Sequence, residues 1–124
     1  IDKFPFATDT NATDVGNLSV VRNGPAGQSS TENGYTSGGR TPAYVTTIDK
    51  FPFASDANAN VVANLTQGRY FAASQSSERD GYTSGGFTPG GVNTIDKFPF
   101  ASDDNATDVG DLTQARYGAA GQQD

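Results

Sequence analysis

The hydrophobic positions of this chain follow one pattern, which recurs without insertion or deletion. The sequence Ile-Asp-Lys-Phe-Pro-Phe-Ala begins at Ile1, Ile48 and Ile95, so the period is 47 residues. A fixed period of this length is typical of one supersecondary unit copied along a chain. The pattern predicts repeats at 1–47 and 48–94 and a partial repeat at 95–124, and we expect the chain to be a segment of a longer array.

Two strands are predicted in the first part of each repeat. In Ile1–Ala7 the aromatic residues alternate with other residues, which is typical of a strand. Pro5 interrupts this pattern and lacks an N–H, so the strand is an edge, a bend, or a segment whose N–H faces away from a partner. Val15 and Leu18 are three residues apart, and a glycine nearby disfavours a helix, so we expect an irregular strand with a bulge.

Two more strands are predicted in the second part of each repeat. One lies in the stretch of small residues Arg22–Ser30, and the other is Gly34–Gly39, repeated intact at Gly81–Gly86. Glycine follows Asn33 and Asp80, and these dipeptides are strong turn signals. No segment has a helical period, so the sequence predicts an all-β chain with about four short strands in each repeat.

We expect the repeats to stack as β-arch or β-solenoid layers of a cross-β, amyloid-like kind. In such a stack, equivalent residues of successive repeats form ladders. The predicted apolar stacking core is Phe4, Phe6, Val15, Leu18, Phe51, Phe53, Val62, Leu65, Phe98, Phe100, Val109 and Leu112. The predicted polar ladders are Asn11, Asn58 and Asn105, and Gln28, Gln75 and Gln122. The predicted turn glycines are Gly34, Gly38, Gly39, Gly81, Gly85 and Gly86.

The repeats resemble those of extracellular, biofilm-associated, amyloid-like bacterial fibril proteins. The resemblance rests on the gapless 47-residue period, on a composition rich in Gly, Ser, Thr and Asn, and on the recurring IDKFPFASD and GYTSGG sequences. It implies self-assembly into a homopolymer filament that forms a scaffold in an extracellular matrix. Similar repeats also occur in phage tail-fibre and adhesin proteins.

A second resemblance, to the kelch repeat, gives the alternative fold of β-propeller blades. It rests on the order of an arginine, a run of small residues, a turn, GYTSGG and TIDKF, because a double glycine follows a strand in kelch repeats. The strand before that double glycine is polar here (Tyr35, Thr36, Ser37), and the kelch tryptophan is absent. A closed propeller also needs roughly four or more blades. This resemblance implies a binding module in a surface adhesin or phage tail fibre that recognises a glycan or a protein. We expect GYTSGG itself to serve tight packing between a strand and a turn, with stacking of Tyr35 and Tyr82 on sugar rings as the weaker alternative.

Composition and charge exclude some classes of function. Fourteen acidic and eight basic residues give a net charge of −6, so no basic face exists to meet nucleic acid. Four charged columns, beginning at Asp2, Lys3, Asp9 and Arg22, recur in all three copies and sum to zero, so these charges compensate if they lie side by side. No apolar run approaches the roughly 18 residues that span a bilayer.

Candidate catalytic chemistry is scarce. His and Cys are absent, which excludes Ser-His-Asp and Cys-His nucleophiles, and we expect no enzyme. The absence of oxidisable sulfur suits a secreted, extracellular protein. Asp and Asn side chains at Asp9, Asn11 and Asp14, and again near Asp103 and Asp108, offer oxygens to Ca²⁺ but lack the glycine and glutamate of an EF-hand. We therefore expect them to cap turns, with Ca²⁺ as the weaker alternative and no other cofactor.

Overall fold

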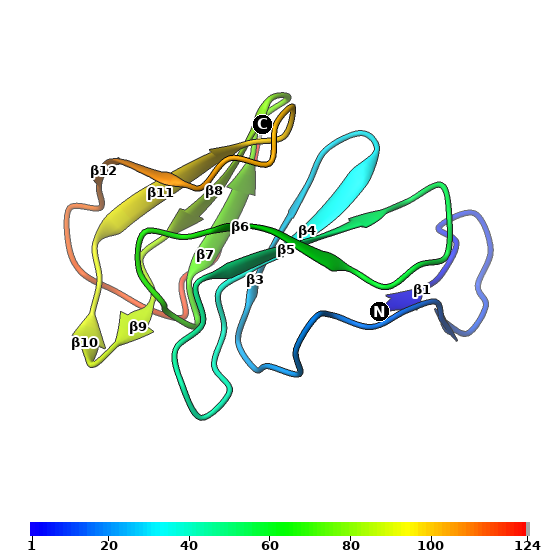
Figure 1. The fold of residues 1–124 in the computed structure, drawn as a ribbon, viewed down its shortest axis with the longest axis horizontal. Coiled ribbons are helices and arrows are strands. Elements are labelled where there is room, and N and C mark those ends of the chain that lie inside the picture. The colour runs from blue at the N-terminus through cyan, green and yellow to red at the C-terminus, as the bar shows by residue number, and fades with distance from the viewer. Residues whose placement is uncertain (124) are drawn as a thin grey trace.

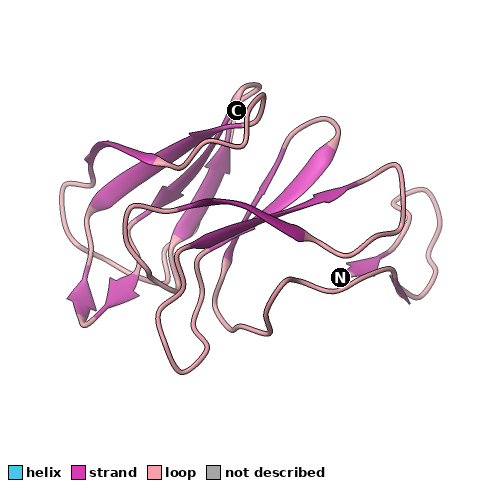
Figure 2. Ribbon diagram, viewed as in Figure 1, coloured by secondary structure: helices cyan, strands magenta, loops and turns pink. Residues whose placement is uncertain are grey.

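The computed structural model describes residues 1–123 and is all-β over that range. Figure 1 labels all of the strands except β2, and Figure 2 shows strands and loops with no helix among the described residues. No helix capable of spanning a membrane occurs in this part of the chain. The strands are β1 (Asp2–Lys3), β2 (Thr13–Asp14), β3 (Ala26–Ser29), β4 (Asn33–Ser37), β5 (Thr47–Pro52), β6 (Asn60–Asn64), β7 (Ala73–Ser76), β8 (Asp80–Ser84), β9 (Phe87–Thr88), β10 (Gly90–Gly91), β11 (Thr94–Pro99) and β12 (Thr107–Asp111).

The strands form two four-stranded antiparallel sheets. One has the order β3-β4-β5-β6 and the other β12-β11-β8-β7, so neighbours in the chain are mostly neighbours in the sheet. The registers match: Tyr35 lies opposite Lys50 in the first sheet, and Tyr82 lies opposite Lys97 in the second. Each sheet takes two strands from before an IDKFPFA sequence, one strand that contains most of this sequence, and one strand from after it. The short pairs β1-β2 and β9-β10 form separate two-stranded sheets (Figure 1).

The predicted irregular strand with a bulge is confirmed in the second and third repeats, whereas in the first repeat β2 ends before Val15 and its pairing has no bulge. Ile48 pairs with Ala63 and Asp49 pairs with Val61, so Val62 is the extra residue on β6. The same shift occurs between β11 and β12. The prolines recur as the last residues of β5 and β11, where the missing N–H falls at the end of the ladder.

Four of the predicted turn glycines adopt the left-handed conformation that favours glycine. The φ angles are 64° and 105° at Gly38 and Gly39, and 65° and 108° at their copies Gly85 and Gly86. The prediction is wrong for Gly34 and Gly81, which lie inside β4 and β8. These two glycines face the rings of Phe51 and Phe98 so closely that a Cβ atom would overlap the ring. Close packing, and not a turn, therefore requires glycine there.

The hydrophobic core lies between the two large sheets. Its buried members are Tyr35, Ile48, Ala63, Leu65, Phe98 and Ala106, with Val62 and Phe100 packed against them. Tyr35 from β4 contacts Phe98 and Phe100, with ring centroids 5.6 and 4.8 Å away. A tyrosine of one sheet thus covers the phenylalanine pair of the next.

This arrangement corrects part of the predicted stacking core. Leu65 and Phe98 are buried as predicted, whereas Phe4, Phe6, Phe53 and Val109 are exposed, with Phe6 at 95%. The remaining predicted core residues are half-buried: Val15, Leu18, Phe51, Val62, Phe100 and Leu112. The physical reason is that a phenylalanine pair is covered only where the tyrosine of a preceding sheet reaches it, and Phe51 and Phe53 have no such tyrosine among the described residues.

The predicted polar ladders are also wrong for the described residues. The side-chain oxygen of Asn58 accepts a hydrogen bond from the Asn17 N–H at 2.9 Å, and Asn105 accepts one from Asn64 at the same distance. The Gln28 amide donates to Thr83 Oγ1 at 2.8 Å. Within residues 1–123, no strand ladder pairs a residue with its equivalent in the next repeat. The hydrogen-bonding groups of the inner strands β4, β5, β8 and β11 are already used by their neighbours in the same sheet.

Candidate binding surfaces and buried ion pairs

Two buried ion pairs connect successive copies of the repeat. The Arg22 Nη2 group pairs with the Asp49 carboxylate, and Arg69 pairs with Asp96 at 2.5 Å. All four side chains are 0% exposed. The expectation that the recurring charges compensate one another is confirmed for the arginine and aspartate residues of these two pairs, but their burial was not predicted.

Hydrogen bonds satisfy Arg22 Nη1 and the Asp49 carboxylate in the first pair, whereas the buried Arg22 Nε has no hydrogen-bond partner among the described residues. Arg22 Nη1 donates to the carbonyl oxygens of Gly38 and Thr47 at 3.0 and 3.1 Å, and to Thr47 Oγ1 at 2.8 Å. The Asp49 carboxylate accepts hydrogen bonds from the backbone N–H and hydroxyl of Ser19 at 2.8 and 2.7 Å. The pair therefore fixes the segment before β3 to both β4 and β5. It is closed to solvent, so it serves the fold and has no access to a substrate.

The other recurring charges pair at the surface. Lys3 contacts Asp56 at 3.1 Å, and Lys50 contacts Asp103 at 3.0 Å. The hydrogen bond to Asp103 raises the pKa of Lys50 above its ordinary value of 10.5, while partial desolvation opposes this shift. Exposed ion pairs of this kind contribute little to the free energy of unfolding. They therefore affect the relative placement of the repeats more than the stability of the fold.

An aromatic row crosses the loops at one end of the sheets. We define it as Tyr44, Tyr70, Phe71, Phe87 and Tyr117. The Tyr70 ring contacts those of Tyr44, Phe71 and Phe87, and the Phe87 ring contacts that of Tyr117, with centroids 4.5–5.8 Å apart. These residues come from the β4–β5 loop, the segment before β7, strand β9 and the segment after β12 (Figure 1). The Arg40 guanidinium lies over the Tyr44 and Tyr70 rings, 5.5 and 5.7 Å from their centroids. The row therefore combines flat apolar faces with a cationic hydrogen-bond donor.

Phe71 occupies a backbone conformation that side chains rarely adopt. Its φ angle is 53°, and the equivalent positions in the other repeats are Gly24 and Gly118, at 57° and 67°. Holding a non-glycine residue in this region costs on the order of 1–3 kcal/mol, and such outliers cluster at functional sites. The Phe71 side chain remains 48% exposed, so burial compensates for only part of this cost. This exposed, strained aromatic residue marks the row as a candidate binding surface.

The sequence analysis did not identify the aromatic row. It placed sugar stacking on Tyr35 and Tyr82, but Tyr35 is buried in the core and Tyr82 is half-buried. The row was missed because only Tyr70 and Tyr117 share a column of the repeat, whereas the predictions rested on residues that recur in every copy. The usable signal was Phe71, an aromatic residue where both other copies have glycine.

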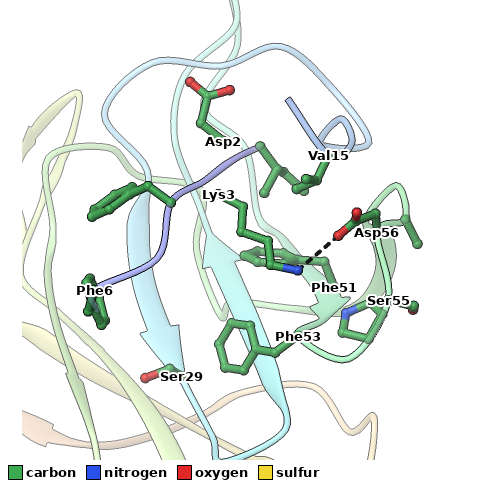
Figure 3. A pocket seen from close by; sticks show the side chains of 13 residues that line it. Asp2, Lys3, Phe6, Val15, Ser29, Phe51, Phe53, Ser55 and Asp56 are labelled. Carbon is green, nitrogen blue, oxygen red and sulfur yellow. Dashed lines mark hydrogen bonds and ion pairs between the residues drawn. The ribbon is translucent and has the colours of Figure 1, made fainter. Parts of the chain in front are cut away.

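A second surface is an apolar groove beside β1, with a volume of about 560 Å³. Figure 3 shows the Phe51 and Phe53 rings below Lys3, whose amino group reaches Asp56, with Phe6 to one side. Ile1, Phe4 and Val15 complete its apolar lining. The groove lies where Phe51 and Phe53 lack the covering tyrosine that Phe98 and Phe100 have.

The candidate calcium ligands do not gather into a metal site. Asp14 and Asp108 each accept a hydrogen bond from the N–H two residues later, at 3.2 and 3.1 Å, as turn-capping carboxylates do. No group of three or more His, Cys, Asp or Glu side chains with metal-ligand geometry occurs within residues 1–123.

Comparison with known proteins gives no family assignment. No protein-family model matches the sequence, and no curated protein matches it.

Proposed function

We propose that this chain is part of a kelch-like β-propeller and acts as a non-enzymatic binding module that recognises a glycan through the aromatic row. The strand pairing supports the propeller arrangement. A propeller blade is a four-stranded sheet whose hydrogen bonds stay within the blade, whereas cross-β layers place their hydrogen bonds between successive layers. The antiparallel β3-β4-β5-β6 order agrees with the first description. The setting that fits such a module is a secreted surface adhesin or a phage tail fibre.

The observation that carries the binding proposal is the left-handed, exposed Phe71, which contacts Tyr70, the ring over which Arg40 lies. A sugar ring has a flat face of C–H groups that stacks on an aromatic ring, and its hydroxyls accept hydrogen bonds from a guanidinium. Glycine in the other two copies shows that the fold itself does not need a side chain at this position. A ligand-contacting role accounts for keeping a strained aromatic residue there.

Phe71→Gly tests this proposal, because it restores the residue found in the other two copies. The wild-type chain is screened on a glycan array, and affinity for the best ligand is measured by calorimetry. We expect the variant to bind about tenfold more weakly or worse, a loss of about 1.4 kcal/mol or more. It should also unfold at equal or higher urea concentration, because relief of a strained φ, worth on the order of 1–3 kcal/mol, offsets the entropic cost of glycine, which is roughly 0.5–1 kcal/mol.

The control is Val61→Ser, which changes another exposed apolar residue, on β6 and outside the row. It should bind like the wild type. Absence of glycan binding by the wild type, or equal affinity of the Phe71→Gly variant, would refute the proposed site.

A second candidate function is that of a structural, self-assembling fibril protein of an extracellular matrix or biofilm. The observation that favours it is the open groove beside β1, with exposed Phe4, Phe6 and Phe53 at the same end of the molecule. Filaments formed this way would join sheets side by side. Electron microscopy of concentrated protein separates the two candidates, because unbranched filaments support assembly and discrete particles support the binding module.

A further inference from the structure

The β1-β2 pair is half of the unit found twice elsewhere in the chain. Its residues Asp2 and Lys3 are equivalent to Asp49 and Lys50 on β5, and β2 corresponds to β6. In the complete sheet β5 pairs with β4 on one side and β6 on the other, whereas β1 pairs only with β2 within the described residues. We propose that the free edge of β1 and the adjoining groove dock a strand of the repeat's own sequence, Gly-Tyr-Thr-Ser, from another polypeptide segment.

The register of the two complete sheets specifies how this strand would sit. Tyr35 lies opposite Lys50, and Tyr82 lies opposite Lys97. The docked tyrosine therefore lies opposite Lys3, antiparallel to β1. An unpaired strand edge offers backbone N–H and C=O groups to an incoming strand, and adding a strand to a sheet edge is a known mode of peptide recognition.

The groove provides the place for the tyrosine ring. In the complete interface, Tyr35 is 3% exposed and lies between Phe98 and Phe100, and its hydroxyl points to the Phe100 carbonyl oxygen at 3.5 Å. Phe51 and Phe53 are the equivalent pair, and they line the groove together with Lys3 (Figure 3). The residue that the register places opposite Lys3 is thus the residue that the groove is shaped to receive.

Charge gives a second, independent argument. Asp49 and Asp96 each pair with an arginine that precedes them in the chain. Asp2, in the same column, is exposed and forms no ion pair among residues 1–123. A docked segment that begins at the repeat's arginine and continues through Gly-Tyr-Thr-Ser supplies both missing partners. Such a segment has the sequence of Arg69–Thr94.

The test uses a fluorescently labelled synthetic peptide with the sequence Arg69–Thr94, titrated into the 124-residue chain by fluorescence anisotropy. We expect saturable binding with one peptide per chain, and new hydrogen-exchange protection at β1. Replacing the peptide's tyrosine, Tyr82→Ser, should weaken binding about tenfold or more, because the aromatic contact and its buried area are lost. This variant leaves the protein itself unchanged, so a folding defect cannot explain the result.

Protein variants complete the test. Phe53→Ser should weaken peptide binding to a similar extent, and it should fold normally because Phe53 is 46% exposed. Val21→Ser, at a 94% exposed position away from the groove, should bind like the wild type. Phe71→Gly should also bind the peptide normally, which separates this proposal from the glycan site.

Two results would overturn the inference. One is the absence of saturable binding, or binding that neither Tyr82→Ser nor Phe53→Ser weakens. The other is a dimer of the chain alone on size-exclusion chromatography that Phe53→Ser dissociates, because a second intact copy would then be the occupant of the groove.

Discussion

Replacing Asp49 with asparagine tests the role of the buried ion pairs. Asn has nearly the same shape and keeps one oxygen for the Ser19 hydrogen bonds, but it removes the charge that faces Arg22. Both side chains are 0% exposed, so the guanidinium would remain buried without a counter-ion. Breaking a buried pair in this way costs about 3–5 kcal/mol, a large share of the roughly 5–15 kcal/mol that stabilises a typical domain.

Urea unfolding, followed by circular dichroism, measures this cost as a shift of the midpoint at constant slope. The matched control is Asp2→Asn, which makes the same change in the same column, where the side chain is exposed and has no arginine partner within residues 1–123. We expect the control to change stability by no more than about 0.5 kcal/mol. Equal urea midpoints for Asp49→Asn and Asp2→Asn would refute the reasoning, because Asp49 would then be no more dependent on a buried partner than the exposed Asp2.

Gly81→Ala should destabilise the fold by about 1–3 kcal/mol in thermal unfolding, because the new methyl group would overlap the buried Phe98 ring. The control is Gly27→Ala, which has open space at the Cβ position and should be neutral or slightly stabilising in the same assay. Lys50 has a raised pKa in the folded state, so its pair with Asp103 should stabilise the fold fully below pH 10.5 and lose that contribution as the pH rises through the higher folded value. Asp103→Asn should therefore lower the urea midpoint at about pH 8 and have a smaller effect at about pH 11; an effect that grows with pH would contradict this sign.

Local sequence patterns predicted the strands but not their partners. The alternating residues before Pro52 and the polar run ending at Gly38 form strands where the sequence places them. A 47-residue period is compatible with pairing inside one unit or between units, because both arrangements repeat every side chain at the same interval. The choice depends on how each unit is rotated against the next, and no single residue encodes that rotation.

Burial was the property that the columns of the repeat could not predict. Phe51 and Phe98 share a column, yet only Phe98 has a tyrosine of a preceding sheet over it. The same holds for Asp2 and Asp49, which are identical in sequence and opposite in exposure. Identical residues in one column were expected to be buried to the same extent. Their burial depends on the neighbouring unit that packs over them, and that unit differs from one copy to the next. The aromatic row was not predicted because Phe71 differs from the glycines at the equivalent positions of the other copies, and the predictions rested on residues that recur.

The central claim is that strands pair within one antiparallel unit and that equivalent strands of successive repeats do not pair. Nuclear Overhauser contacts between backbone protons of the dissolved chain measure this pairing directly. The structure predicts contacts between Tyr35 and Lys50 and between Tyr82 and Lys97, because these residues lie opposite each other. Backbone contacts between Tyr35 and Tyr82, or between Lys50 and Lys97, would contradict the account and indicate stacked cross-β layers.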